Sequence, residues 1–486
     1  MTTIHLMTIK RHLLLAVISL VCNLAAMAQE TDKMKFPGGR SYMFRLYFTD
    51  KQGTPYSIEH PEQFLSERAL DRRRKQHLEV DSTDFPVNTH YLDSILSMGM
   101  EVVCKSKWNN SALVRARKQS AQASLSHLPF VKKVQQVWAS PDSIDRPKAK
   151  VRYRDGHNSW DILEQNSGGA TYEQLEMLNG NRLHRQGFRG KGMVIAVLDG
   201  GFLNADVIPS LKDVSVLGHA DFVLNVMKDG FFGGIDHGTK VLSTMAANEP
   251  DRFVGAAPEA SYWLLRCEDP LTETMAEEDY WAAAVEFADS VGVDVINSSL
   301  GYHDFDDKTM NFKYRQLDGH STMISHTASM LADKGIVLVC SAGNDGMGTW
   351  KKISFPADAH DVLTVGAVNA MRQNAAFSAV GPTADGRVKP DVMAMGSPAS
   401  VITGRGTISR DIGTSFSAPI VAGLVACLWQ AMPEKSAREI IEVVRGSGDN
   451  ATSPDNIYGY GIPDFYAPLR KAKNKTSQSP ANDKTL

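Results

Sequence analysis

The chain has 486 residues, which is too long for one ordinary domain and suits two or three. Hydrophobic residues make up 43% of it and charged residues 22%, as in a normal globular protein. The formal net charge of −3 provides no broad basic face, so the composition argues against a nucleic-acid partner.

The first residues have the pattern of an export signal. Lys10 and Arg11 precede an apolar run at 13–21, and Ala26-Met27-Ala28 supplies a small-x-small cleavage pattern. The alternative is a membrane anchor, but the run is well short of the ~20 residues that a spanning helix needs. We therefore expect a signal peptide at 1–28, no membrane span, and a secreted or periplasmic protein.

Residues 41–139 have the pattern of a small, separate α+β unit. Strands are expected at 42–48, 101–107, 112–116 and 130–138, and helices at 61–76, at 90–96 and before the last strand. This order approximates a β-α-β-β-α-β plan with one extra helix. The run Arg72-Arg73-Arg74-Lys75 is compatible with a binding patch, but a solvated helix face is the interpretation that we prefer.

Polar segments separate this unit from the rest of the chain. Residues 139–170 are rich in Pro, Asp, Ser, Asn and Gly and lack periodicity, which predicts a linker that we place at 141–170. The tail at 471–486 is also polar and is expected to be disordered. A main domain at 171–470 remains between them.

The main domain alternates short apolar runs with helical patterns. The expected strands are 193–198, 262–265, 293–297, 336–340 and 362–368, and helices are expected at 280–290 and 322–334. Strands that are apolar throughout indicate a mostly parallel sheet covered on both faces, a three-layer α/β fold. Such folds bind ligands beyond the carboxyl ends of their strands, so polar residues at those ends are candidates for chemistry.

Four residues in glycine-containing motifs meet this criterion. Asp199 ends the first strand, His237 precedes a helical run, Asn344 follows the strand at 336–340, and Ser415 begins an apolar helix. Each has an ordinary explanation as a turn residue, a structural histidine or a helix cap. Together they match the residue types of a nucleophile, a base, an orienting acid and an oxyanion donor.

The order of these residues separates the known classes of serine hydrolase. Asp…His…Ser is the subtilisin order, whereas an esterase or lipase of the α/β-hydrolase type runs Ser, acid, His and carries a G-x-S-x-G elbow. The segment Gly413-Thr414-Ser415-Phe416-Ser417 lacks that elbow. A metal site at His237 would need a partner His or Cys at ligand spacing, and none is near.

On these segments the chain resembles the subtilisin-like serine proteases over about 171–466. Ser299-Leu300-Gly301 resembles the strand that pairs with substrate in that family, and the segments 255–258 and 389–391 agree as well. The resemblance implies a secreted serine endopeptidase with Asp199, His237 and Ser415 as its triad, Asn344 in the oxyanion hole, and no cofactor. It also implies that the unit at 29–140 is a propeptide that assists folding, covers the cleft and is then removed. The alternative for this unit is an independent accessory domain.

The implied partners are polypeptide substrates and the chain's own propeptide. One position departs from the family pattern: Gly200 stands where a Ser or Thr usually follows the catalytic Asp, which questions how Asp199 is oriented. This departure is the only support for the second hypothesis, a non-catalytic peptide-binding relative. Many relatives bind calcium, but no dense Asp/Asn loop predicts a metal site here. The cysteines are expected to be buried free thiols.

Overall fold

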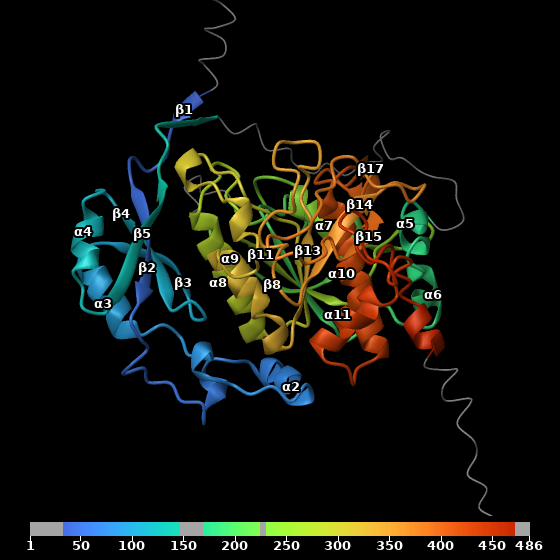
Figure 1. Cartoon of the computed structure of the whole chain (residues 1–486), viewed down its shortest axis with the longest axis horizontal. Coiled ribbons are helices and arrows are strands. Elements are labelled where there is room, and N and C mark those ends of the chain that lie inside the picture. The colour runs from blue at the N-terminus through green and yellow to red at the C-terminus, as the bar shows by residue number, and fades with distance from the viewer. Residues whose placement is uncertain (1–32, 146–168, 224–229, 472–486) are drawn as a thin grey trace, which may run out of the picture.

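The computed structural model describes residues 33–145, 169–223 and 230–471, which form two packed units (Figure 1). The expected signal peptide at 1–28, the tail at 472–486 and most of the expected linker lie outside the described residues. In Figure 1 the N-terminal unit, in blue and cyan, lies against one side of the larger C-terminal domain.

A seven-stranded sheet forms the centre of the larger domain, in the order β15-β14-β13-β12-β7-β11-β8. All its strand pairs are parallel, as predicted. The strands are β7 (Val194–Asp199), β8 (Ser215–Asp221), β11 (Ser261–Arg266), β12 (Val295–Ser298), β13 (Val337–Ser341), β14 (Leu363–Val368) and β15 (Val392–Met395). The sequence pattern did not indicate the two edge strands, because β8 is largely exposed and β15 has only four residues.

Helices cover both faces of this sheet, which confirms the three-layer α/β fold. One hydrophobic cluster contains side chains of α7 (His237–Ala246), α10 (Thr414–Ala431) and α11 (Ala437–Arg445). The other contains side chains of α8 (Ala276–Val291) and α9 (Met323–Ser329). Within the described ranges, α10 alone is long and apolar enough to cross a membrane, and 89% of its tested window is buried in the domain.

Short elements complete this domain at its periphery. They are α5 (Tyr172–Glu176), α6 (Gly180–Arg185), the strand pair β9 (Asn248–Glu249) and β10 (Phe253–Val254), and the hairpin of β16 (Ala399–Ile402) and β17 (Ile408–Asp411). Cys267, Cys340 and Cys427 are buried free thiols, as expected, whereas the free thiol of Cys104 is only half-buried.

The N-terminal unit is a four-stranded antiparallel sheet in the order β3-β4-β2-β5, packed with short helices. Its elements are β1 (Lys33–Lys35), β2 (Tyr42–Phe48), α2 (Glu67–Lys75), α3 (Thr89–Ser97), β3 (Glu101–Ser106), β4 (Ser111–Ala116), α4 (Ala121–Ser126), β5 (Val131–Ala139) and β6 (Ser143–Asp145). The predicted β-α-β-β-α-β plan with an extra helix is confirmed.

Two boundaries differ from the prediction. The helix expected at 61–76 is divided into a 3₁₀ turn at Pro61–Gln63 and α2, because the Ser66 hydroxyl caps α2 by accepting from the Ala69 N–H at 3.2 Å. Strand β6 pairs with β1, so the N-terminal unit continues past residue 140 into the segment assigned to the linker.

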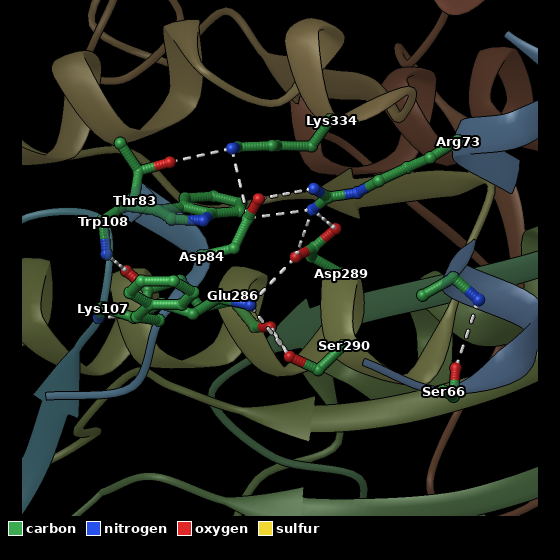
Figure 2. Close-up of polar contacts among 12 residues, drawn as sticks. Ser66, Arg73, Thr83, Asp84, Lys107, Trp108, Glu286, Asp289, Ser290 and Lys334 are labelled. Carbon is green, nitrogen blue, oxygen red and sulfur yellow. Dashed lines mark hydrogen bonds and ion pairs between the residues drawn. The ribbon is translucent and has the colours of Figure 1, made fainter. Parts of the chain in front are cut away.

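The arginine run on α2 is not a solvated face, which corrects our preferred interpretation. Arg74 and Lys75 are exposed, but Arg72 and Arg73 are buried against α8 of the larger domain. Figure 2 shows Asp289 of α8 at the centre of this contact. Its carboxylate lies 2.6 Å from Arg72, 2.9 Å from Arg73 and 3.0 Å from Lys107. The sequence pattern gave no sign of this acidic partner, which lies more than 200 positions away along the chain from α2.

Further buried polar contacts extend this interface. Arg73 forms a second ion pair with Asp84 at 2.6 Å, and Lys334 of the larger domain approaches the same carboxylate at 3.1 Å. Arg45 on β2 pairs with Glu278 at 2.9 Å and with Asp279 at 2.7 Å, both on α8. The N-terminal unit is therefore fixed to α8 by charged groups that are shielded from water.

Candidate active site

Asp199 and His237 form a hydrogen-bonded pair at the carboxyl edge of the sheet. Asp199 ends β7 with no exposed surface, and His237 begins α7 with 32% of its side chain exposed. The Asp199 carboxylate lies 2.8 Å and 3.0 Å from His237 Nδ1. Burial opposes protonation of the imidazole, but the charge and the hydrogen bond of Asp199 raise its pKa to about 9. This is the geometry of a base that an acid holds in one orientation.

Ser415 lies in the first turn of α10, close to this pair. The residue is 8% exposed, and the ring of the next residue, Phe416, has its centroid 5.7 Å from that of His237. The Ser415 hydroxyl donates to the carbonyl of Ser299 at 3.3 Å, and no hydrogen bond among the described residues joins it to His237. In this conformation the Ser415 hydroxyl is therefore directed at the Ser299 carbonyl and not at the imidazole.

Asn344 follows β13 and contacts the start of α10. Its side-chain oxygen accepts from both the N–H and the hydroxyl of Thr414 at 2.9 Å each. These two bonds fix which end of the amide is the acceptor and leave Nδ2 as the donor. The N–H of Ser415 lies in the first turn of the same helix, where backbone N–H groups lack intrahelical partners and the helix dipole favours negative charge.

The segment Ser299-Leu300-Gly301 leaves β12 beside the serine. Ser299 and Leu300 are buried, whereas Gly301 is exposed. The hydroxyl of Ser299 donates to the Ser415 carbonyl at 2.9 Å and accepts from Asn297 at 3.0 Å. This segment is thus fixed relative to the first turn of α10.

Gly200 is explained by a neighbouring carboxylate. A Cβ atom added at Gly200 would lie 2.5 Å from Oε2 of Glu268, so no larger residue fits without displacing that side chain. The N–H of Gly200 itself donates to the Asp199 carboxylate at 2.8 Å. Asp199 is therefore oriented by a backbone donor, without a hydroxyl at position 200.

The sequence motifs singled out neither Glu268 nor Thr414. Glu268 lies two residues after the end of β11, the neighbour of β7, so its position after a parallel strand was the available signal. Thr414 lies inside the serine motif, but only the structure shows that it orients Asn344. The described residues contain no group of three or more His, Cys, Asp or Glu side chains that could hold a metal ion.

Comparison with known proteins agrees with this arrangement. The model of the subtilase family matches residues 190–461, and a model of the peptidase S8 propeptide domain of Bacteroidota matches residues 43–152. Subtilisin NAT from Bacillus subtilis subsp. natto is 30% identical over 290 residues, which is 59% of this chain and 68% of that protein. A thermostable alkaline protease from Halalkalibacterium halodurans is 28% identical over 291 residues, 59% of this chain and 70% of its own.

Among solved structures, the MycP3 protease from the type VII (ESX-3) secretion system has a similar fold. Its TM-score is 0.50 at 24% sequence identity, and the match covers 64% of this chain and 90% of that one. The family match spans more than half of the chain and contains Asp199, His237, Asn344 and Ser415. The chain therefore belongs to the subtilase family and is a serine-type endopeptidase preceded by a propeptide domain.

Proposed function

We propose that this protein is a secreted endopeptidase that uses Asp199, His237 and Ser415 as its catalytic triad. The observation that carries the proposal is the hydrogen-bonded Asp199–His237 pair, which lies beside the first turn of α10 where Ser415 is located. A serine hydroxyl is a weak nucleophile at neutral pH and needs a base of this kind.

The reaction follows from the roles of these groups. Ser415 attacks the peptide carbonyl while His237 accepts its proton, and His237 then protonates the leaving amine. Asp199 holds the imidazole in one tautomer and stabilises the imidazolium. Nδ2 of Asn344 and the N–H of Ser415 bind the oxyanion, and water then hydrolyses the acyl-enzyme. The substrate binds as an extended strand along Ser299-Leu300-Gly301.

The competing hypothesis, a non-catalytic peptide-binding relative, loses its support at Gly200. Glu268 occupies the space beside this glycine, and the N–H of Gly200 supplies a hydrogen bond to Asp199. No triad residue is missing from the chain.

A test compares the wild type with Ser415→Ala, His237→Ala and Asp199→Asn, using casein hydrolysis and labelling with a fluorophosphonate. The first two changes should lower kcat by about 10⁶-fold, and the third by about 10⁴-fold, as equivalent changes do in related serine proteases. The label should attach to Ser415 in the wild type alone. Substantial hydrolysis by purified Ser415→Ala would overturn the assignment.

The removal of the N-terminal unit and the export of the protein belong to the same proposal. The unit matches a propeptide model and is joined to the catalytic domain through the segment 146–168, whose sequence is polar and rich in basic residues. We expect the enzyme to cut itself within this segment and to act outside the cytoplasm.

A further inference from the structure

Glu268 is a second carboxylate next to the catalytic pair. The N–H of Cys267 donates to the carbonyl of Asp199 at 3.1 Å, which places Glu268 beside Gly200 across the sheet. Its Oε2 atom fills the space that a side chain at position 200 would take. Glu268 is partly exposed, whereas Asp199 is fully buried.

The Glu268 carboxylate forms no ion pair in the described part of the chain. The side chains that face it are Asp199, His237, Asp269 and Glu273, so three of the four are carboxylates. Burial and the nearby charge of Asp199 raise the pKa of Glu268 to about 8, and protonated His237 opposes that rise. Once Glu268 is ionised, above its pKa, the site therefore has a surplus of negative charge that an incoming cation would neutralise.

The linker of the same chain supplies cations in a regular pattern. Arg146, Lys148, Lys150, Arg152 and Arg154 stand at every second position. In an extended peptide, alternate side chains point to the same side. A substrate with this sequence, bound as a strand, presents all its basic groups on one face.

The N-terminal unit also brings the end of β5 to the loop that contains Glu268. The indole N–H of Trp138, near the end of β5, donates to the Thr272 hydroxyl at 3.2 Å. Thr272 lies four residues after Glu268, in the connection between β11 and α8. The described chain continues from there through β6 to residue 145, directly before the first of the alternating basic residues.

We propose that Glu268 selects substrates with a Lys or Arg side chain near the scissile bond, and that the alternating basic residues of the linker are the first such substrate. The inference rests on the proposed function and adds a substrate class to it. An ionised carboxylate accepts charge-assisted hydrogen bonds from Arg or Lys, and the partial burial of Glu268 limits screening by salt.

The preference for a basic side chain has a defined dependence on pH. Glu268 attracts a cation only when it is ionised, and its pKa is raised to about 8. Selectivity should therefore be weak at pH 6, rise through pH 8 and level off above it. A bound cation favours the ionised form, so substrate binding releases a proton in this range.

The test uses two internally quenched peptides with the sequence of residues 146–156. One keeps the natural sequence, and in the other each Arg and Lys is replaced by Gln. The readout is the ratio of their kcat/KM values from pH 6 to pH 9. In the wild type we expect the natural peptide to be favoured by about 10- to 100-fold at pH 9, and by much less at pH 6.

Three variants separate the role of Glu268 from a general charge effect. Glu268→Gln keeps the shape and should reduce the ratio to nearly one at every pH. Glu268→Asp keeps the charge and should restore part of the ratio. Glu273→Gln removes a second carboxylate from the same loop. Because that charge helps to raise the pKa of Glu268, the variant should keep the ratio at pH 9, and its rise should begin at lower pH.

The outcomes are distinguishable. An active wild type that cleaves both peptides equally at pH 9, or a Glu268→Gln variant that keeps the full ratio, would overturn the role of Glu268 and leave the endopeptidase assignment intact. A wild type that cleaves neither peptide and does not hydrolyse casein would overturn the proposed function, and this inference with it.

Discussion

The groups around His237 act in opposite directions on the protonation of its imidazole. Burial favours the neutral form, Asp199 and Glu268 favour the imidazolium, and Lys240 opposes it. The carboxylates prevail, because Asp199 contributes both a charge and a direct hydrogen bond at 2.8 Å. The raised pKa of His237 sets the pH range in which the imidazole can act as a base, and it reflects how strongly the imidazolium is stabilised.

The pH–rate profile should therefore be alkaline. His237 must be neutral to accept a proton from Ser415, and its pKa is raised to about 9, so kcat/KM should increase with pH up to about 9. The profile is measured with a peptide that has no ionisable side chain, and circular dichroism checks folding at each pH. Asp199→Asn removes the main cause of the shift and should move the acidic limb to lower pH. A wild-type limb at or below 6.5 would contradict this account.

Asn344 provides a second prediction for a single residue. Asn344→Ala should lower kcat by about 10²- to 10³-fold with little change in KM, because in the proposed mechanism the amide binds the oxyanion and not the ground-state carbonyl. Thr414→Val removes one of the two hydrogen bonds that orient the amide and should cause a smaller loss of the same kind. Near-normal kcat in Asn344→Ala would show that the residue only forms the turn after β13.

The sequence could indicate these side chains because each follows or begins an element with a strong pattern of its own. Asp199 and Asn344 follow apolar strands, and Ser415 begins an apolar helix, so topology alone brings them to one edge. Glu268 also follows a strand, but its place beside Gly200 depends on a contact across neighbouring strands, which the sequence does not reveal. The hydrogen bond of Ser415 to Ser299 depends on a rotamer, which no sequence pattern encodes.

At the scale of elements, α8 is buried although its composition is that of an exposed helix. The helix carries acidic side chains on several sides, which ordinarily predicts exposure, yet Glu278, Asp279, Glu286 and Asp289 are all buried. Cations from the N-terminal unit make this burial possible, as Figure 2 shows for Asp289. The arginine run on α2 was misassigned for the same reason. Both patterns are polar because they face each other, not because they face water.

Breaking this contact should destabilise the precursor strongly. In a Ser415→Ala background, which prevents self-cleavage, Asp289→Ala leaves Arg72, Arg73 and Lys107 buried without their shared acceptor. We expect the free energy of unfolding to fall by about 3–5 kcal/mol. Urea denaturation followed by tryptophan fluorescence measures the change.

The matched control is Asp71→Ala, which removes an exposed partner of Arg74 on α2 and should cost at most ~1 kcal/mol. If Asp289→Ala does not fold, Asp289→Asn keeps the shape and should show an intermediate loss. Equal midpoints for Asp289→Ala and Asp71→Ala would show that the buried ion pairs do not hold the two units together.

At the scale of the whole molecule, both units and the parallel sheet could be predicted from the sequence. The way in which the two units pack against each other could not. The plan of each unit follows from local periodicity in strands such as β2 and β7. Their relative position depends on pairings such as Arg45 with Asp279, which lie 234 positions apart along the chain. A single sequence contains no signal for such distant pairs.

The proposed maturation gives a prediction at this scale. The wild type should appear outside the cell as a protein that begins within or after residues 146–168, and Ser415→Ala should accumulate as a longer precursor. Intact-mass spectrometry of both secreted proteins gives the answer. An active wild type that retains Tyr42 to Trp138 covalently would disprove the propeptide assignment. Processing of Ser415→Ala to the same product would assign the cut to another protease.

The acidic partners on α8 have a consequence for handling the mature enzyme. Loss of the N-terminal unit removes the counterions of Glu278, Asp279 and Asp289 and the hydrogen-bond donors of Glu286, and it exposes this face of α8 to solvent. Self-repulsion of such a cluster is relieved by dissolved cations. The processed enzyme should therefore bind an anion-exchange resin more tightly than its length suggests. It should also stay folded and active for longer during storage when the ionic strength is higher. The precursor, in which the same carboxylates are already neutralised, should be much less sensitive to salt.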